Sequence, residues 1–178
     1  MALLSRLRPF VLGACALAAT ASSVSAAEYY ITTRAWDKVQ GWEIAYNEDR
    51  NGCFAYAEYS GGYYIWFGFN GVERDGFLAI SNEKWKHITA NQTYDARYLF
   101  DGSRSWTGRG TGYVLKSSAG VDVGNLKIEF MRDFAHSGRV EVTLANRKER
   151  LSLKGTRAAL EEAYRCTAAL AVNRPAPE

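Results

Sequence analysis

The chain has 178 residues, of which 47% are hydrophobic and 13% aromatic, and it carries a net charge of +3 at pH 7. The length and composition suit one globular domain with a sizeable core. The sequence contains no polybasic run, so its charge gives no support for nucleic acid or an anionic membrane as a partner.

Residues 1–27 have the features of a secretory signal peptide. Two arginines precede an apolar run at 10–19, and small residues then allow cleavage after Ala26 or Ala27. The apolar run is too short to span a bilayer, which takes roughly 20 residues. Cleavage would remove both arginines and leave 20 basic and 19 acidic residues. We expect a nearly neutral, periplasmic or secreted protein with no transmembrane segment in the mature chain.

Cys15 allows a second interpretation of the N-terminus. Leu12-Gly13-Ala14-Cys15 loosely resembles the motif at which bacterial lipoproteins are cleaved and acylated. The apolar run before Cys15 is very short, and the better cleavage site lies downstream. A lipoprotein acylated at Cys15 is therefore the alternative to a freely exported protein.

Two cysteines, Cys53 and Cys166, remain after cleavage. A pair of cysteines in an oxidising compartment is most simply a disulfide. Zinc is a poor alternative, because two cysteines without a nearby histidine pair do not make a site. The chain-entropy model assigns a bond across so long a loop roughly 4–5 kcal/mol of stability. We predict a Cys53–Cys166 disulfide and no metal site.

The first half of the mature chain predicts short strands separated by Asn-Gly and Gly-rich turns. Trp42, Ile44 and Tyr46 alternate with other residues, as in a half-buried strand. We expect Ser81 to cap a brief helical turn that reaches Trp85. The expected strands cover residues 42–46, 53–59, 63–69 and 77–80.

The second half predicts further strands and two helices. Apolar residues recur at spacing four across 125–135, which favours a helix there. A last helix is expected from Thr156, with Leu160 and Tyr164 on one face and Pro175 beyond its end. The expected strands cover residues 94–100, 105–115, 140–144 and 151–153.

These elements predict a mainly β, β-rich α+β fold. We expect an antiparallel sandwich or barrel with a C-terminal helix clamped to it by the disulfide. The expected organisation is a signal peptide at 1–27, a single β-rich domain at 28–172 and a disordered tail at 173–178.

A set of aromatic, turn and cysteine positions runs through most of this domain. Its residues are Trp42-x-Ile44, Cys53, Leu78-x-Ile80-Ser81-Asn82-x-x-Trp85, Phe100-Asp101-Gly102, Trp106-x-Gly108, Leu151-x-Leu153-x-Gly155 and Cys166. The set resembles small, uncharacterised exported proteins of alphaproteobacteria. The resemblance implies the fold and the compartment, and it carries no catalytic residue onto this chain.

Catalytic signatures are scarce. The only histidines are His87 and His136, and neither stands in a G-x-S-x-G or H-E-x-x-H context. We expect a protein that is not an enzyme and needs no cofactor. A pair of carboxylates could still form a glycosidase site, and the candidates are Glu43, Glu58, Glu73, Asp75, Asp95 and Asp101.

Aromatic residues crowd the strands at 53–59 and 63–69. In an extended strand Tyr64 and Trp66 face one way, while Tyr63 and the apolar residues that follow it face the other. One set fills the core, and the other is covered by the last helix or exposed as a binding surface. The candidate binding residues are Tyr64, Trp66, Trp106 and Arg109.

The favoured function is a non-enzymatic binding module for a protein or glycan of the cell envelope. One alternative is an inhibitor or immunity-type protein that acts through a protruding loop at 101–109, because that stretch is polar and Gly-rich. The other is a carboxylate-dependent envelope hydrolase.

Overall fold

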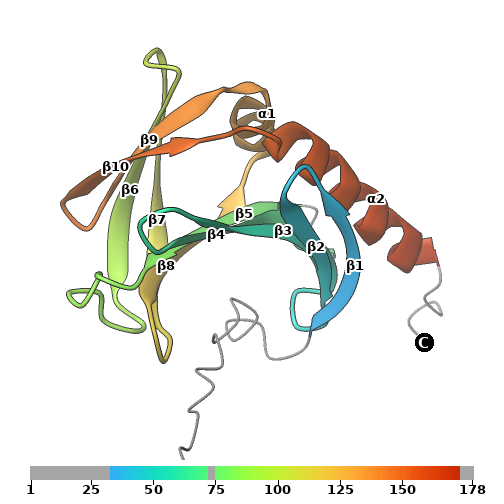
Figure 1. The fold of residues 1–178 in the computed structure, drawn as a ribbon, viewed down its shortest axis with the longest axis horizontal. Helices are drawn as coiled ribbons and strands as arrows, with labels where there is room; N and C mark the ends of the chain where they lie inside the picture. Colours follow the sequence, from blue (N-terminus) through green and yellow to red (C-terminus); the bar gives the residue numbers. More distant parts are fainter. Residues whose placement is uncertain (1–32, 72–74, 173–178) are drawn as a thin grey trace, which may run out of the picture.

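The computed structural model describes residues 33–71 and 75–172, which form ten strands and two helices (Figure 1). The expected signal peptide, Cys15 and the tail at 173–178 lie outside this part of the chain. The strands are β1 (Thr33–Val39), β2 (Trp42–Asn47), β3 (Gly52–Tyr59), β4 (Tyr63–Phe69), β5 (Gly76–Asn82), β6 (Thr93–Phe100), β7 (Arg104–Val114), β8 (Ala119–Leu126), β9 (Arg139–Leu144) and β10 (Arg147–Ser152); the helices are α1 (Ile128–His136) and α2 (Thr156–Val172).

All ten strands join one antiparallel sheet in the order β1-β2-β3-β4-β5-β8-β7-β6-β9-β10. The sheet is not closed, but it curls so that β9 and β10 lie across the interior from β3 and β4 (Figure 1). The hydroxyl of Tyr59 on β3 donates to the carbonyl of Ser152 on β10 at 2.7 Å, which links the edge strand β10 to β3 across the curl. The predicted mainly β, antiparallel fold is confirmed.

The inner face of this curl, on the side of both helices, carries the main hydrophobic core. Helix α1 presents Phe130 and Phe134 to it. The ring of Phe134 meets that of Phe67 on β4 with centroids 4.9 Å apart, and Phe130 meets Tyr98 on β6 at 5.0 Å. Helix α1 therefore joins β4 in one half of the sheet to β6 in the other.

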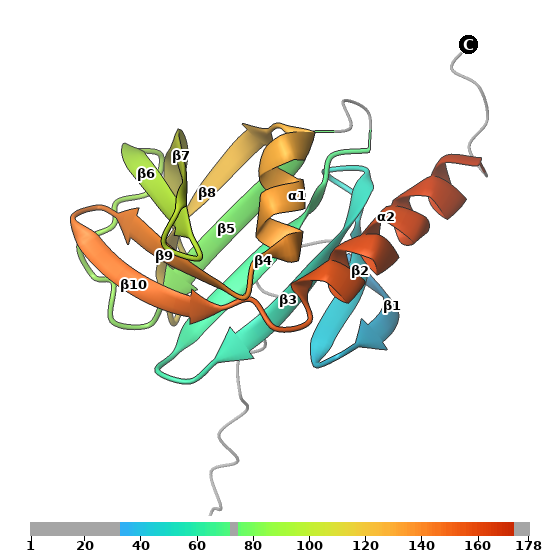
Figure 2. The same ribbon diagram turned by 90° about the horizontal axis from the view of Figure 1, so that it is seen from above.

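Helix α2 lies over the first strands of the sheet (Figure 2) and contacts β1, β2, β3 and β4. The predicted disulfide is present: Cys53 opens β3, Cys166 lies on α2, and their Cα atoms are 5.9 Å apart. The amide of Cys53 also donates to the Thr167 hydroxyl at 2.9 Å. The clamped C-terminal helix is thus confirmed.

Several local expectations were wrong. Strands β1 and β8 were not predicted: β1 is mostly exposed and β8 is rich in small residues, so neither shows a strong apolar alternation. The helix expected at 125–135 begins at 128, because β8 reaches Leu126. Ser81 is a buried residue of β5, and only turns follow, where the amide of Lys84 donates to the Asn82 side chain at 2.8 Å.

Candidate functional site

The outer face of the sheet, opposite the two helices, is continuous from β3 to β10 and changes its chemistry half-way. One cross-strand row shows the continuity, because each residue in it is the register partner of the next. The row runs through Tyr56, Trp66, Ala79, Asp122, Thr111 and Thr93. We call the part on β3 to β5 the aromatic half, made by Phe54, Tyr56, Tyr64, Trp66 and Phe77.

The basic half lies on β7, β6, β9 and β10. Its outward residues are Ser105, Thr107, Arg109, Asp95, Arg97, Leu99, Arg139, Glu141, Thr143, Lys148 and Arg150.

The aromatic half is packed. The rings of Tyr64 and Trp66 stack with centroids 6.0 Å apart, and Trp66 meets Tyr113 edge-on at 6.4 Å. Tyr64 is 9% exposed and Trp66 only 1%. The Tyr64 hydroxyl donates to Glu83 at 3.0 Å, and burial, with that bond, raises the pKa of Tyr64 to about 12. These side chains form a second, smaller core on the outer face of the sheet.

The border between the halves is built around Arg50. Its guanidinium carbon lies 4.0 Å from the centroid of the Phe77 ring, and the same group pairs with Asp122 on β8. A further bond of 3.3 Å runs from Arg50 to Asn70. Arg50 therefore covers one end of the aromatic half and is engaged there.

The basic half is organised in rows that cross its strands. Thr107, Arg97, Thr143 and Lys148 form one row, in which each residue is the register partner of the next. Ser105, Leu99, Glu141 and Arg150 form the adjacent row. Because neighbouring strands are about 4.8 Å apart, side chains in one row lie within reach of each other.

Two carboxylates neutralise part of this surface. Asp95 pairs with Arg109 at 3.7 Å, and both side chains are largely exposed. Glu141 lies between Lys148 at 2.7 Å and Arg150 at 3.1 Å. The hydrogen bond from Lys148 holds the pKa of Glu141 below its usual value, against the opposing effect of burial.

Five cationic and two acidic side chains leave the basic half with an excess of three positive charges. Arg97 and Arg139 make no ion pair with any residue in 33–71 or 75–172. Their guanidinium groups are available to an anionic ligand.

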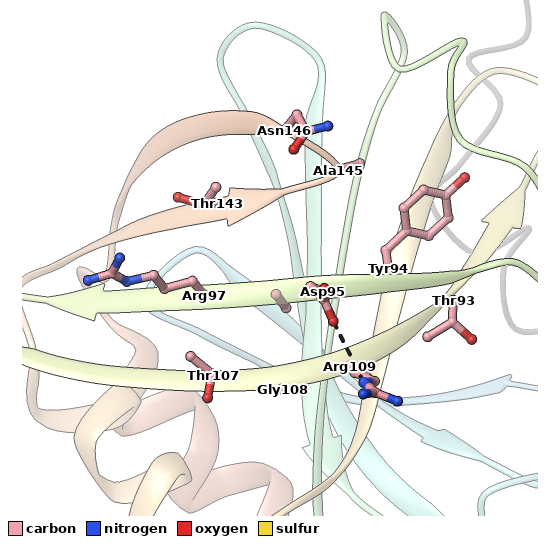
Figure 3. A pocket seen from close by; sticks show the side chains of 11 residues that line it. Thr93, Tyr94, Asp95, Arg97, Thr107, Gly108, Arg109, Thr143, Ala145 and Asn146 are labelled. Carbon is pink, nitrogen blue, oxygen red and sulfur yellow. Dashed lines mark ion pairs between the residues drawn. The ribbon is translucent and has the colours of Figure 1, made fainter.

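An open groove of about 720 Å³ lies on this half (Figure 3). Its polar side chains come from β6, β7, β9 and the turn after β9: Thr93, Asp95, Arg97, Thr107, Arg109, Thr143 and Asn146. A smaller hollow of about 310 Å³ continues along β6 and β9 past Leu99, Arg139 and Glu141. The groove offers hydroxyl, amide, carboxylate and guanidinium groups beside the apolar parts of Tyr94, Ala96 and Ala145, so it can hold a ligand that carries polar groups.

The four candidate binding residues do not come together. Tyr64 and Trp66 are buried in the aromatic half. Trp106 faces inward, where its Nε1 donates to Asp133 at 2.8 Å and its ring packs against Phe130. Only Arg109 borders the groove. Sequence reasoning missed Arg97, although the strict alternation along 93–100 already placed it on the solvent side of its strand.

The stretch expected to be a loop, 101–109, is a turn followed by a strand. Residues 101–103 form a tight turn, and β7 begins at Arg104. Arg104 bonds Asp133 at 2.8 Å and the Ser137 hydroxyl at 2.9 Å, which ties the start of β7 to the end of α1. Asp101 accepts the amides of Gly138 and Arg139 at 3.2 and 3.1 Å. These carboxylates hold turns and strands in place.

Two further features concern the described part of the chain. Its residues include no group of three His, Cys, Asp or Glu side chains positioned to hold a metal ion. No helix within residues 33–71 and 75–172 is long and apolar enough to cross a membrane.

Comparison with known proteins finds a shared fold and no sequence relative. Invasion-associated protein B from Bartonella henselae, a solved structure, superimposes with a TM-score of 0.54 at 11% sequence identity. The match covers 80% of this chain and 99% of that one. No protein-family model and no curated protein sequence matches this chain. The likeness supports the similarity to alphaproteobacterial proteins at the level of the fold.

Proposed function

We propose that this protein is an exported, non-enzymatic binding module of the cell envelope, which holds a polar ligand on the basic half of its outer face. The observation that carries the proposal is the groove beside Arg97, where a guanidinium that no carboxylate of residues 33–71 or 75–172 pairs with lies near threonine side chains on an exposed sheet. A sheet surface gives a ligand a fixed set of donors, because the strands are held by their register.

Export is supported by two separate features. The N-terminal sequence has the order of charge, apolar run and small residues that signal peptides share. The Cys53–Cys166 bond is of the kind that persists in oxidising compartments. We propose that the mature protein is released into the periplasm or secreted, and acylation at Cys15 would instead place it on a membrane.

The carboxylates argue for binding over hydrolysis. Asp95 is paired with Arg109, Glu43 with Lys38 at 2.5 Å, and Asp101 holds two backbone amides. A glycosidase needs two carboxyl groups roughly 5–10 Å apart across the scissile bond. These three acids are engaged in separate local contacts, and Asp95 is the one of them that lines the groove, so a ligand there meets cations, hydroxyls and one carboxylate paired with Arg109 rather than a catalytic pair.

The test is equilibrium binding of the mature protein, residues 28–178, to a defined panel: polygalacturonate, dextran, poly-glutamate and vesicles of phosphatidylglycerol. We expect saturable binding of at least one member, weakened about tenfold by Arg97→Gln, since bonds from charged groups are worth roughly 1.5–3 kcal/mol. Arg157→Gln, on the exposed side of α2, is the matched control and should leave binding unchanged.

The bound polymer should also be recovered at its original length by size-exclusion chromatography. Shortened polymer would show hydrolysis and overturn the non-enzymatic part of the proposal. If no member of the panel binds, or if Arg97→Gln and Arg157→Gln act alike, the basic half is not a binding surface.

A further inference from the structure

The ligand class can be inferred from the same face, and the inference rests on the proposed function. Arg97 has Thr107 as its register partner on β7 and Thr143 as its partner on β9. Directly opposite residues in an antiparallel pair have Cβ atoms about 4.5–5.5 Å apart. The side chain of Arg97 therefore leaves the sheet between two threonine side chains, and its guanidinium has no carboxylate of its own among the described residues.

This arrangement matches a carboxylate. A guanidinium presents two parallel N–H donors that fit the two oxygens of a carboxylate group. The threonine hydroxyls on either side add donors or acceptors for neighbouring polar groups. A sugar unit that bears a carboxylate supplies both, because its ring hydroxyls lie next to the charged group.

A second guanidinium, that of Arg139, also lacks an ion pair within the part of the chain that the structure describes, and it extends the site along β9. Arg139 lies four residues before Thr143 on the same outward face, which is about 13 Å at 3.3 Å per residue. Glu141 lies between these two positions, and Lys148 and Arg150 both pair with it. Its charge is therefore compensated, and an anionic chain crosses it without strong repulsion. Two anchors at this separation suit a polymer better than a single small anion.

The composition of the face distinguishes a polysaccharide from other anionic partners. Stable protein interfaces have an apolar core enriched in aromatic residues, and surface-bound helices need an apolar face to enter a membrane. Single-stranded nucleic acid is held largely by stacking on exposed aromatic rings. Leu99, half-buried, is the one large apolar side chain among the outward residues of the basic half. In the aromatic half the rings of Phe54, Tyr64, Trp66 and Phe77 are buried and that of Tyr56 is half-buried, so none of them is fully exposed for stacking.

We infer that the basic half binds an acidic polysaccharide, with sugar carboxylates seated at Arg97 and Arg139 and sugar hydroxyls at Thr107 and Thr143. The line from Arg97 to Arg139 runs along β6 and β9, through the two hollows of this half, so a chain longer than the site can follow it. Binding depends on charge and should weaken as salt rises, because exposed charges are screened within about 10 Å at 0.1 M salt.

The experiment compares polygalacturonate with its carboxyl-reduced form, in which each carboxylate has become an alcohol, by titration calorimetry on the mature protein. We expect polygalacturonate to bind and the reduced polymer to lose at least about tenfold in affinity. Arg97→Gln and Arg139→Gln should each weaken the binding of polygalacturonate about tenfold. The double variant that combines Thr107→Val and Thr143→Val should weaken it severalfold. Arg157→Gln controls for the loss of one positive charge elsewhere.

The outcomes separate the inference from the proposed function. Equal binding of both polymers, or equal effects of Arg97→Gln and Arg157→Gln on polygalacturonate, overturns the acidic-polysaccharide inference. If poly-glutamate, phosphatidylglycerol vesicles or a single-stranded oligonucleotide binds through Arg97 while polygalacturonate does not, the binding module stands and its ligand belongs to that other class. If none of these probes binds, both proposals fail. Circular dichroism and melting curves on each variant show that a loss of binding is not a loss of folding.

Discussion

The two halves of the outer face are built on the same backbone pattern and have opposite chemistry. In both, residues at every second position point away from the helices. In the aromatic half these positions hold Tyr64, Trp66 and Phe77, which are buried. In the basic half they hold Arg97, Arg109 and Thr107, which are exposed. Alternation therefore identifies which residues share a face, and side-chain chemistry decides whether that face is a core or a surface.

The halves also differ in what lies behind them. The inner side of the aromatic half carries α2, which the disulfide attaches to β3. The inner side of the basic half packs on α1 through Phe130, with Arg104 and Trp106 bonded to Asp133. In the first half a covalent bond attaches the helix to the sheet. In the second half aromatic and polar contacts hold the helix on the sheet. The comparison predicts that stability depends mainly on the first half and ligand binding on the second.

The largest expected effect is on folding and comes from Trp66→Ala. Removing a buried indole costs about 3–5 kcal/mol, because the favourable transfer free energy of the ring is lost and the cavity left behind adds a further penalty. Urea denaturation of the mature protein measures the change in unfolding free energy, and Trp66→Phe, which keeps a ring in place, should cost clearly less. Wild-type stability in Trp66→Ala, with loss of ligand binding, would show instead that the aromatic half is a binding surface.

The disulfide should be the next largest contributor. Cys53→Ser and Cys166→Ser should each lower the unfolding free energy by about 2–4 kcal/mol, and the double variant should equal either single one, because each change removes the same bond. Amide exchange should rise more in β2, β3 and β4, which contact α2, than in β6 and β9. An equal rise of amide exchange in both groups of strands would show that the disulfide does not stabilise the first half more than the second.

The pH dependence should reveal the burial of Tyr64. Its pKa is raised to about 12 in the folded state, while an unfolded tyrosine has a pKa near 10. The unfolded chain therefore loses this proton first, so the stabilisation is complete below about pH 10 and is lost as the pH rises through about 12. Tyrosine ionisation can be followed by the absorbance of tyrosinate as the pH is raised. The Tyr64→Phe variant should show one tyrosine fewer with a raised pKa than the unsubstituted protein. A normal titration of Tyr64 would place its ring in solvent.

The sequence predicted well those elements whose side chains alternate strongly or whose spacing repeats. Strands β3 and β4, the helix over the sheet and the Cys53–Cys166 pair follow from such local patterns. Strand β8 was missed because its outward positions are small or polar, such as Gly120 and Asp122. The groove could not be predicted, because Arg97 and Thr143 meet only through the pairing of β6 with β9. That pairing brings together strands separated in the chain by β7, β8 and α1, and no local pattern encodes it.

Glu141→Gln should have the smallest effect on stability of the substitutions considered. It also tests how charge on the basic half controls binding. Lys148 and Arg150 are exposed and Glu141 is half-buried, and ion pairs with exposed partners contribute about 0–1 kcal/mol each. Freeing the two cations should therefore change the unfolding free energy little, as urea denaturation would show. The same substitution removes one of the two carboxylates from the basic half and leaves both cations in place. The affinity for polygalacturonate should therefore rise severalfold, and the gain should shrink as salt screens the added charge. A fall in affinity would mean that Glu141 orients its two cations for the ligand rather than competing with it.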